Sequence, residues 1–404
     1  MTDRSDEHPS VPPRLHFFGF NTLRFLAATA VFLYHLDLQK DPLLLPRMLS
    51  PKMAASLGGA GVDLFFVLSG FLITYLILAQ IRDTKGDFGI RNFYIRRALR
   101  IQPLYICLVI LAYFPGRWFV SSSSLPVDRY IRVHQLAFSQ HWIRSLILYM
   151  VMLPNVAVLA YPTSIYASQC WSIGVEEQYY LIWPWAIRWA GSFRRMVTLC
   201  VVYITVVVAC SITMIMLRCR LPPGSACLER WNTISKWVGL MNMSGLALGS
   251  LFAVWLFFRR ESVVSTVSSE WIRKCWLPLI VLFMATRSDH WRLLSMMGYG
   301  IVILNMAIDR HAENRYPRMT EYLGKVSYGM YMYHPAAILF SLWGIQALTR
   351  WRFPVFFNLH QNISTVVLVF SSFGITLGLS LISYGMIERP FLELKASFGS
   401  VSRM

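Results

Sequence analysis

Charged residues are scarce in this sequence of 404 residues, because Asp, Glu, Lys and Arg together make up only 14% of it. Soluble globular domains average about 25% charged and about 45–50% apolar residues. Here 56% of the residues are apolar and the mean hydropathy is +0.48, which excludes a soluble globular domain. Apolar runs recur from end to end, so the sequence indicates one membrane domain.

Cysteine pairs and a cleavable leader are missing as well. The seven Cys residues are scattered without a CxxC motif, which indicates neither a zinc site nor a redox dithiol. We therefore expect no metal and no permanently bound cofactor. The first 16 residues are polar and contain no apolar stretch followed by a small-residue cleavage site. We expect residues 1–16 to form a short cytoplasmic tail.

Acidic residues are also few, with 20 Asp and Glu against 38 Lys and Arg, which gives a formal net charge of +18. In a soluble protein this excess would suggest nucleic acid as a partner. In a membrane protein, Lys and Arg gather in cytoplasmic loops and beside lipid headgroups. We therefore expect membrane lipids, and not nucleic acid, as partners.

Ten apolar runs are candidates for crossing a bilayer, which takes about 20 helical residues. The runs 275–286 and 293–308 are short for this purpose. A further run, 146–160, is interrupted at Pro154, and we interpret it as re-entrant or interfacial. The ten runs are 17–38, 57–80, 101–116, 171–187, 196–217, 237–258, 275–286, 293–308, 326–348 and 363–387.

The distribution of basic residues favours one orientation of these runs. With the N-terminus inside, the cytoplasmic segments hold 22 Lys and Arg and the outer segments hold 15. Basic residues concentrate on the cytoplasmic side of membrane proteins. The sequence thus predicts an all-α integral membrane bundle of about ten transmembrane helices with both termini cytoplasmic. We expect a membrane domain over residues 17–390 and a cytoplasmic tail over residues 391–404.

Ionisable side chains inside the apolar runs are few, and such residues usually mark function because they are costly at bilayer depth. Arg24 and His35 are eleven residues apart, about 20° beyond three full helical turns. Both therefore lie on one helix face, about 16 Å apart along the axis. The ionisable residues away from the ends of the runs are Arg24, His35, Asp63, Glu176, Glu177 and His334.

Three of these residues are expected at a similar, outer depth, namely His35, Asp63 and Glu176. They could meet in one outer-leaflet cavity, with Arg24 below it. Glu176 and Glu177 are neighbours on a helix and point about 100° apart, so only one of them should face the cavity. Which carboxylate partners His35 stays open.

Each of these residues also has a purely structural interpretation. Arg24 could bridge helices or extend toward the headgroups. His35 could be a neutral core residue bonded to a carbonyl, and Asp63 could cap a helix. His334 precedes Pro335, and we interpret it as a packing residue at a helix kink.

Two arginines in the run FYIRRALRIQP (93–103) lie at a predicted membrane boundary. Arg97 and Arg100 are three residues apart and share a helix face. They could anchor the helix at the cytoplasmic surface. They could equally form a clamp for phosphates, which Arg binds by paired hydrogen bonds.

Six motifs follow one another along nearly the whole chain, from Phe20 to Phe391. They are FNTLRFLAATAVFLYHL (20–36), GGAGVDLFFVLSGFLIT (58–74), IRRALRIQPLY (95–105), WSIGVEEQYYLIWP (171–184), VSYGMYMYHP (326–335) and MIERPF (386–391). In this order they resemble the membrane acyltransferase family three, bacterial inner-membrane O-acyltransferases that act on glycans and glycolipids.

The resemblance implies an enzyme of the cell inner membrane, an acyltransferase that transfers groups other than amino-acyl groups. It implies cytoplasmic acyl-CoA, with acetyl-CoA expected, as the donor substrate. The implied acceptor is a hydroxyl of a cell-surface carbohydrate or glycolipid, such as lipopolysaccharide. Some relatives carry a C-terminal periplasmic hydrolase-like domain that this sequence lacks, so we expect transfer to be completed within the membrane domain.

Acyl transfer from a thioester needs a base for the acceptor hydroxyl and stabilisation of negative charge. His35 is predicted as the general base. Glu176, or alternatively Asp63, would orient it as a carboxylate orients a triad histidine. Arg24 would stabilise negative charge, either in the transition state or on the pantetheine arm.

Arg97 and Arg100 would hold the CoA phosphates at the cytoplasmic mouth. Direct transfer and an acyl-His35 intermediate are not distinguished at this point. The alternative function is a proton-coupled secondary transporter that uses Arg24, His35 and Glu176 as a relay. Transporters often show inverted repeats and paired broken helices, and the sequence shows neither.

Two cysteines in the predicted outer loop 218–236 could form a disulfide. Cys219 and Cys227 are eight residues apart, and an oxidising compartment would favour their pairing. Two unrelated thiols are an equal alternative. Four cysteines in or beside apolar runs are expected to stay reduced, namely Cys107, Cys200, Cys210 and Cys275, and Cys170 has no evident partner.

Overall fold

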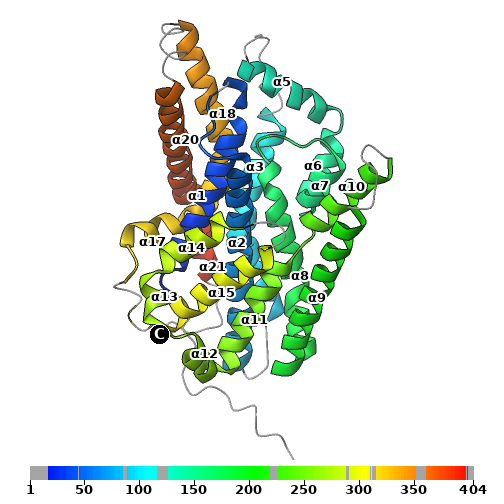
Figure 1. Ribbon diagram of the computed structural model, residues 1–404, viewed down its shortest axis with the longest axis vertical. Helices are drawn as coiled ribbons and strands as arrows, with labels where there is room; N and C mark the ends of the chain where they lie inside the picture. Colours follow the sequence, from blue (N-terminus) through cyan, green and yellow to red (C-terminus); the bar gives the residue numbers. More distant parts are fainter. Residues whose placement is uncertain are drawn as a thin grey trace, which may run out of the picture.

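The computed structural model describes residues 17–43, 45–84, 89–115, 126–218, 226–287, 291–309, 311, 315–351, 361–396 and 398. Over these residues all regular secondary structure is helical (Figure 1). The predicted all-α fold is therefore confirmed for the described part of the chain.

The helices carry the labels of Figure 1. Their bounds are α1 Phe20–Gln39, α2 Pro51–Asp83, α3 Ile90–Tyr113, α5 Pro126–Ser139, α6 Trp142–Met150, α7 Pro154–Ala160, α8 Trp171–Ala190, α9 Phe193–Arg218, α10 Ala226–Leu240, α11 Ser244–Phe258, α12 Arg260–Val267, α13 Glu270–Lys274, α14 Trp276–Ala285, α15 Arg292–Ile308, α17 Arg318–Lys325, α18 Ser327–Trp351, α20 Gln361–Ser383, a π-helical segment Tyr384–Glu388, and α21 Arg389–Ala396.

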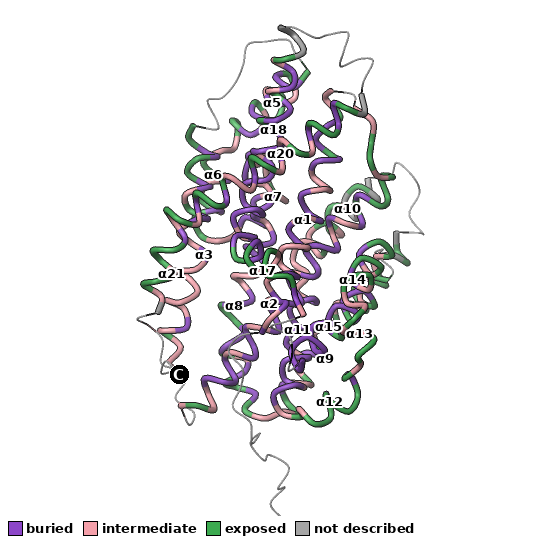
Figure 2. Tube along the Cα trace, turned by 90° about the vertical axis from the view of Figure 1, so that its left-hand side faces the viewer, coloured by how far each residue is buried: buried purple, intermediate pink, exposed green. Residues whose placement is uncertain are grey.

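Among the described residues, four helical stretches are long and apolar enough to cross a membrane, judged by length and composition: Pro51–Asp83, Phe193–Met214, Asn232–Phe258 and Ile363–Lys395. In the apolar part of α2, 72% of the residues are buried, whereas in that of α9 only 11% are. Figure 2 shows buried residues toward the middle of the bundle and exposed residues on outer helices such as α6 and α14. Apolar residues exposed on outer helices suit contact with lipid, so the arrangement fits a multi-pass membrane protein.

α2 lies at the centre of the bundle and packs against both α1 and α11 (Figure 1). Small residues allow this close approach. A Cβ atom added at Gly61 would lie 2.6 Å from the Ala27 carbonyl oxygen, and one at Gly70 would lie 2.0 Å from the Leu246 carbonyl oxygen. Helices in membranes pack through such small residues. The tight packing fixes the depth of α1 relative to α2.

The run 146–160 is interrupted, and the break lies just before Pro154. α6 ends at Met150, Met152 adopts a left-handed conformation with φ of 60°, and α7 begins at Pro154. The run 237–258 is also divided, because α10 ends at Leu240 and α11 begins at Ser244. The two short runs 275–286 and 293–308 form α14 and α15.

The chain between α7 and α8 is folded inside the bundle. Ser164 donates from its hydroxyl to the Ala112 carbonyl (3.3 Å), and Gln169 donates from its side-chain amide to the Met332 carbonyl (2.6 Å). Backbone that is not helical is tolerated at membrane depth only where protein surrounds it. As a result α8 begins in the interior, where the Trp171 ring lies 6.4 Å from that of Phe66.

The structure tests only some of the expectations about the cysteines. Cys219 lies outside the described residues, so its pairing with Cys227 stays a prediction. The four cysteines expected to stay reduced, Cys107, Cys200, Cys210 and Cys275, are free thiols, and so is Cys170.

Candidate functional site

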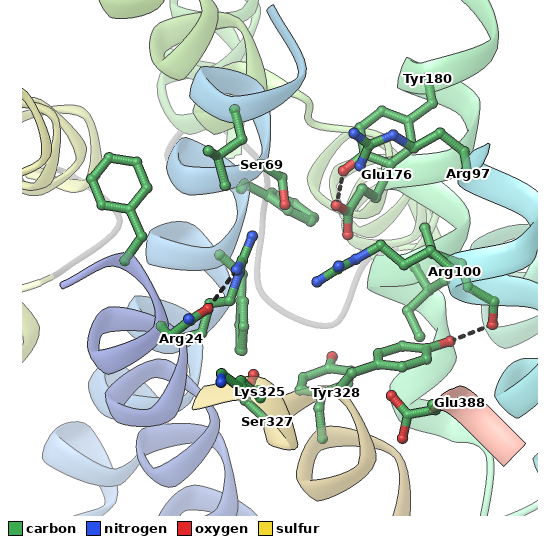
Figure 3. Close-up of a pocket in the computed structure, with 18 of the residues that line it drawn as sticks. Arg24, Ser69, Arg97, Arg100, Glu176, Tyr180, Lys325, Ser327, Tyr328 and Glu388 are labelled. Carbon is green, nitrogen blue, oxygen red and sulfur yellow. Dashed lines mark hydrogen bonds between the residues drawn. The ribbon is translucent and has the colours of Figure 1, made fainter. Parts of the chain in front are cut away.

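A cavity of about 390 Å³ opens between α1, α2, α3, α8, α17, α18 and the segment from Tyr384 to Lys395 (Figure 3). Its volume is within the range of sites for small molecules and cofactors. The walls combine aromatic and aliphatic side chains of α1 and α2 with a ring of charged groups. Such a combination suits a ligand that has both charged and apolar parts.

The charged lining is mostly cationic. It contains five basic side chains and two carboxylates, an excess of three positive charges when all are ionised: Arg24, Arg97, Arg100, Lys325 and Lys395 against Glu176 and Glu388. Figure 3 shows the guanidinium groups of Arg24 and Arg100 pointing toward one another across the cavity. Like charges held together in a confined space favour an anionic ligand, and guanidinium groups favour phosphate or carboxylate.

Arg24 is held in place from the start of its own helix. Its Nη1 donates to Oδ1 of Asn21 (2.9 Å), and Nδ2 of Asn21 donates to Oε2 of Glu321 on α17 (3.3 Å). Oε1 of Glu321 accepts from the backbone N–H groups of Gly19 (2.8 Å) and Thr22 (3.2 Å). Glu321 therefore caps the first turn of α1, where a negative charge is stabilising.

On the other side of the cavity, α3 and α8 present an arginine, a tyrosine and a carboxylate together. The Arg97 guanidinium lies 5.5 Å from the centre of the Tyr180 ring, close enough for a cation–π interaction. The Tyr180 hydroxyl donates to Oε1 of Glu176. From the sequence we expected Arg24 below an outer cavity and Arg97 and Arg100 at the cytoplasmic mouth. In the structure all three residues line the same cavity.

The sequence missed three charged residues of this wall, Lys325, Glu388 and Lys395. Glu388 ends the π-helical segment, and π turns occur often at functional sites. Pro390, two residues later, cannot donate a helical hydrogen bond. This proline and the motif MIERPF (386–391), which contains Glu388, are the signals that the sequence offered. Residues 391–396, expected in the tail, continue the helix as α21 and bring Lys395 to the cavity.

His35 does not line this cavity but pairs with His334 on α18. Nδ1 of His35 lies 3.1 Å from Nε2 of His334 and 3.0 Å from the carbonyl oxygen of Val31. Nδ1 of His334 lies 2.8 Å from the carbonyl oxygen of Tyr331, whose side chain does line the cavity. His334, interpreted from the sequence as a packing residue, is a direct partner of His35.

The structure does not bring His35, Asp63 and Glu176 together, so the expected outer cavity is wrong. Glu176 lies with Arg97 and Tyr180 because α8 begins inside the bundle, deeper than a helix that starts at the membrane surface. Glu176 lines the cavity and its neighbour Glu177 does not. Of the two neighbouring carboxylates, Glu176 is therefore the one that faces the cavity.

Asp63 belongs to a separate buried cluster. Its carboxylate accepts from Nε of Arg287 (3.1 Å) and from Nη2 of Arg292 (2.6 Å), and the residue is 1% exposed. Gly61 faces α1, and two residues on, Asp63 is rotated by about 200° and faces α14 and α15. Asp63 therefore ties helices together on the side of α2 away from His35.

No metal centre is visible in the part of the chain that the structure describes. No group of three His, Cys, Asp or Glu side chains there could hold a metal ion. The site thus consists of a cationic cavity and, behind Tyr331, a pair of histidines.

Comparison with known proteins gives matches along nearly the whole chain. A family model described as an acyltransferase domain matches residues 17–385. A Bacillus subtilis protein, to which a peptidoglycan O-acetyltransferase function has been ascribed, is 26% identical over 412 aligned residues, covering 96% of this chain and 56% of the relative. No solved structure matches.

Two further relatives match over a shorter stretch. The peptidoglycan O-acetyltransferase of Listeria monocytogenes is 31% identical over 163 residues, covering 40% of this chain and 22% of the relative. A Staphylococcus aureus protein with an ascribed O-acetyltransferase function is 29% identical over 167 residues, covering 41% and 24%. This chain spans about half the length of the Bacillus relative and less than a quarter of the other two.

Proposed function

This chain belongs to the membrane-bound acyltransferase family 3, and from that premise we propose that it transfers an acetyl group from cytoplasmic acetyl-CoA to a hydroxyl of a cell-surface carbohydrate. The proposed protein is a multi-pass enzyme of the cytoplasmic membrane with about ten transmembrane helices and both termini inside. A peptidoglycan-type glycan is the first acceptor to test, because two relatives carry that activity in their names.

The observation that carries the proposal is the distance between the cationic cavity and the imidazole of His35. Arg24 reaches into the cavity, and His35 follows it by eleven residues on the same face of α1, about 16 Å along the axis. Acetyl-CoA has the same layout, with phosphates at one end, a long uncharged arm, and the thioester at the other end. The cavity would hold the phosphates and His35 would meet the thioester.

The cavity supports this assignment by its chemistry. Arg24, Arg97 and Arg100 offer guanidinium groups that bind phosphate through paired hydrogen bonds. Lys325 and Lys395 add point charges at the same ring. On this proposal Arg24 binds the phosphates of the donor, which differs from both roles expected from the sequence, the transition state and the pantetheine arm.

At the other end of the donor, His35 acts as the general base. Its ring nitrogen takes the proton of the acceptor hydroxyl while the oxygen attacks the thioester carbonyl. The C–O bond forms, the C–S bond breaks, and the proton passes to the CoA thiolate. The products are an acetyl ester and CoA, and no other reactant is needed.

Membrane vesicles that contain the protein test the proposal. They are incubated with radiolabelled acetyl-CoA and soluble peptidoglycan fragments, and ester-linked label is released by mild alkali. We expect label with the natural sequence and roughly 10²- to 10⁴-fold less with His35→Ala, at equal amounts of inserted protein. Full labelling with His35→Ala would refute the role of His35. Proton flux without any acetyl transfer would support the transporter that uses Arg24, His35 and Glu176.

A further inference from the structure

The contacts of the histidine pair determine where its protons are. Nδ1 of His334 lies 2.8 Å from the Tyr331 carbonyl oxygen, and Nδ1 of His35 lies 3.0 Å from the Val31 carbonyl oxygen. A carbonyl oxygen can only accept a hydrogen bond. Both Nδ1 atoms must therefore carry a proton when these bonds form.

The positions of these protons decide which imidazole donates the hydrogen bond between the two rings. With its proton on Nδ1, neutral His334 has a lone pair on Nε2, and this atom lies 3.1 Å from the protonated Nδ1 of His35. His35 donates and His334 accepts. A doubly protonated His334 would instead force Nδ1 of His35 to give up its proton and face the Val31 carbonyl with a lone pair, which is repulsive.

The remaining ring nitrogen is Nε2 of His35. In the neutral pair it carries a lone pair, and none of the described residues forms a hydrogen bond with it. His35 is half-buried, while His334 is completely buried. The outer ring of the pair is thus the one that a substrate can reach, and the atom that it presents is unprotonated.

We propose that His334 is a positioning residue that holds His35 in the tautomer with a free Nε2. This inference rests on the proposed role of His35 as the general base. His334 takes the place that a carboxylate has in a catalytic triad, where the partner sets the tautomer and orients the ring. When His35 accepts a proton on Nε2, its Nδ1 proton stays bonded to His334.

A neutral partner suits this position better than a carboxylate. An unpaired carboxylate in so buried a place would be costly. The two acids that the sequence nominated are engaged elsewhere, Asp63 with Arg287 and Arg292, and Glu176 in the cationic cavity. His334 supplies the acceptor without adding a charge.

Two amide substitutions distinguish the roles of the two ring nitrogens of His334. In His334→Gln the side-chain oxygen can occupy the place of Nε2 and accept from His35. In His334→Asn the shorter amide can reach the Tyr331 carbonyl but not His35. We expect His334→Gln to keep kcat within about threefold and His334→Asn to lower it about 10- to 100-fold, with the KM for acetyl-CoA unchanged in both. Thermal unfolding in detergent shows whether both variants fold.

A double substitution completes the test. If His334 acts through His35, His334→Asn in a His35→Ala background causes no further loss of the residual activity. Equal kcat in the Asn and Gln variants, or an additional loss in the double variant, would overturn the inference. These results leave the proposed function intact, because that function is overturned only if the natural protein transfers no acetyl group. Full activity of His35→Ala would instead overturn the role of His35 on which this inference rests.

Discussion

Arg24 in the cavity and Glu321 on α17 are joined by a single side chain, that of Asn21. The Asn21 amide accepts from Arg24 with its oxygen and donates to Glu321 with its nitrogen. α17 can approach this closely because Gly324 has no side chain, and a Cβ atom there would lie 2.0 Å from the Asn21 carbonyl oxygen. Glu321, which does not line the cavity, thus sets the direction of the arginine inside it.

Asn21→Leu should weaken donor binding without unfolding the protein. Arg24 would lose the acceptor that aims its guanidinium, so we expect the KM for acetyl-CoA to rise about 10-fold with kcat nearly unchanged, the pattern for lost uniform binding. Thr320→Val is the matched control, because it removes the hydrogen bond to Thr22 at the same helix junction and leaves Asn21 and Arg24 in place. An equal rise in KM for the control would assign the effect to helix docking.

Glu321→Gln should act mainly on stability. The substitution keeps the shape but removes the charge that caps the first turn of α1, and losing a cap costs about 0.5–2 kcal/mol. We expect a lower midpoint of thermal unfolding in detergent and a smaller rise in KM than Asn21→Leu gives. An unchanged midpoint would show that the α1 dipole does not need this carboxylate.

Arg100→Gln should raise the KM for acetyl-CoA about 10- to 100-fold, because a hydrogen bond between charged groups contributes about 1.5–3 kcal/mol. Turnover should change much less, since the phosphates do not react. Arg96→Gln provides the control on the same helix. Arg96 donates to the Phe398 carbonyl and to Oε1 of Gln80, and it does not line the cavity. A similar KM for both variants would count against a phosphate clamp.

The sequence predicted best what lies within one helix. Arg24 and His35 share a face of α1 because helical periodicity alone decides it, and Arg97 and Arg100 share a face of α3 for the same reason. The depth of Glu176 could not be predicted, since it depends on how residues 161–170 fold before α8 begins. The partnership of His35 and His334 joins residues 299 apart in sequence, for which one sequence contains no signal.

Asp63 allows the sharpest contrast between the sequence prediction and the structure. As an orienting group for His35, its loss would lower kcat in a folded protein. As the carboxylate between Arg287 and Arg292, its loss would leave two cations close together in a largely buried place. Breaking a buried ion pair costs about 3–5 kcal/mol, so Asp63→Asn should lower the unfolding midpoint and the amount of folded protein.

A second substitution tells these two roles apart. Arg292→Gln removes one of the two cations, and in the Asp63→Asn background it relieves part of the repulsion. The double variant should therefore be more stable than Asp63→Asn alone, and its kcat per folded molecule should be close to that of the natural protein. A stable Asp63→Asn protein with kcat lowered about 100-fold or more would contradict this assignment and indicate that Asp63 acts in catalysis. Thermal unfolding and acetyl transfer measured on the same preparations distinguish the two outcomes.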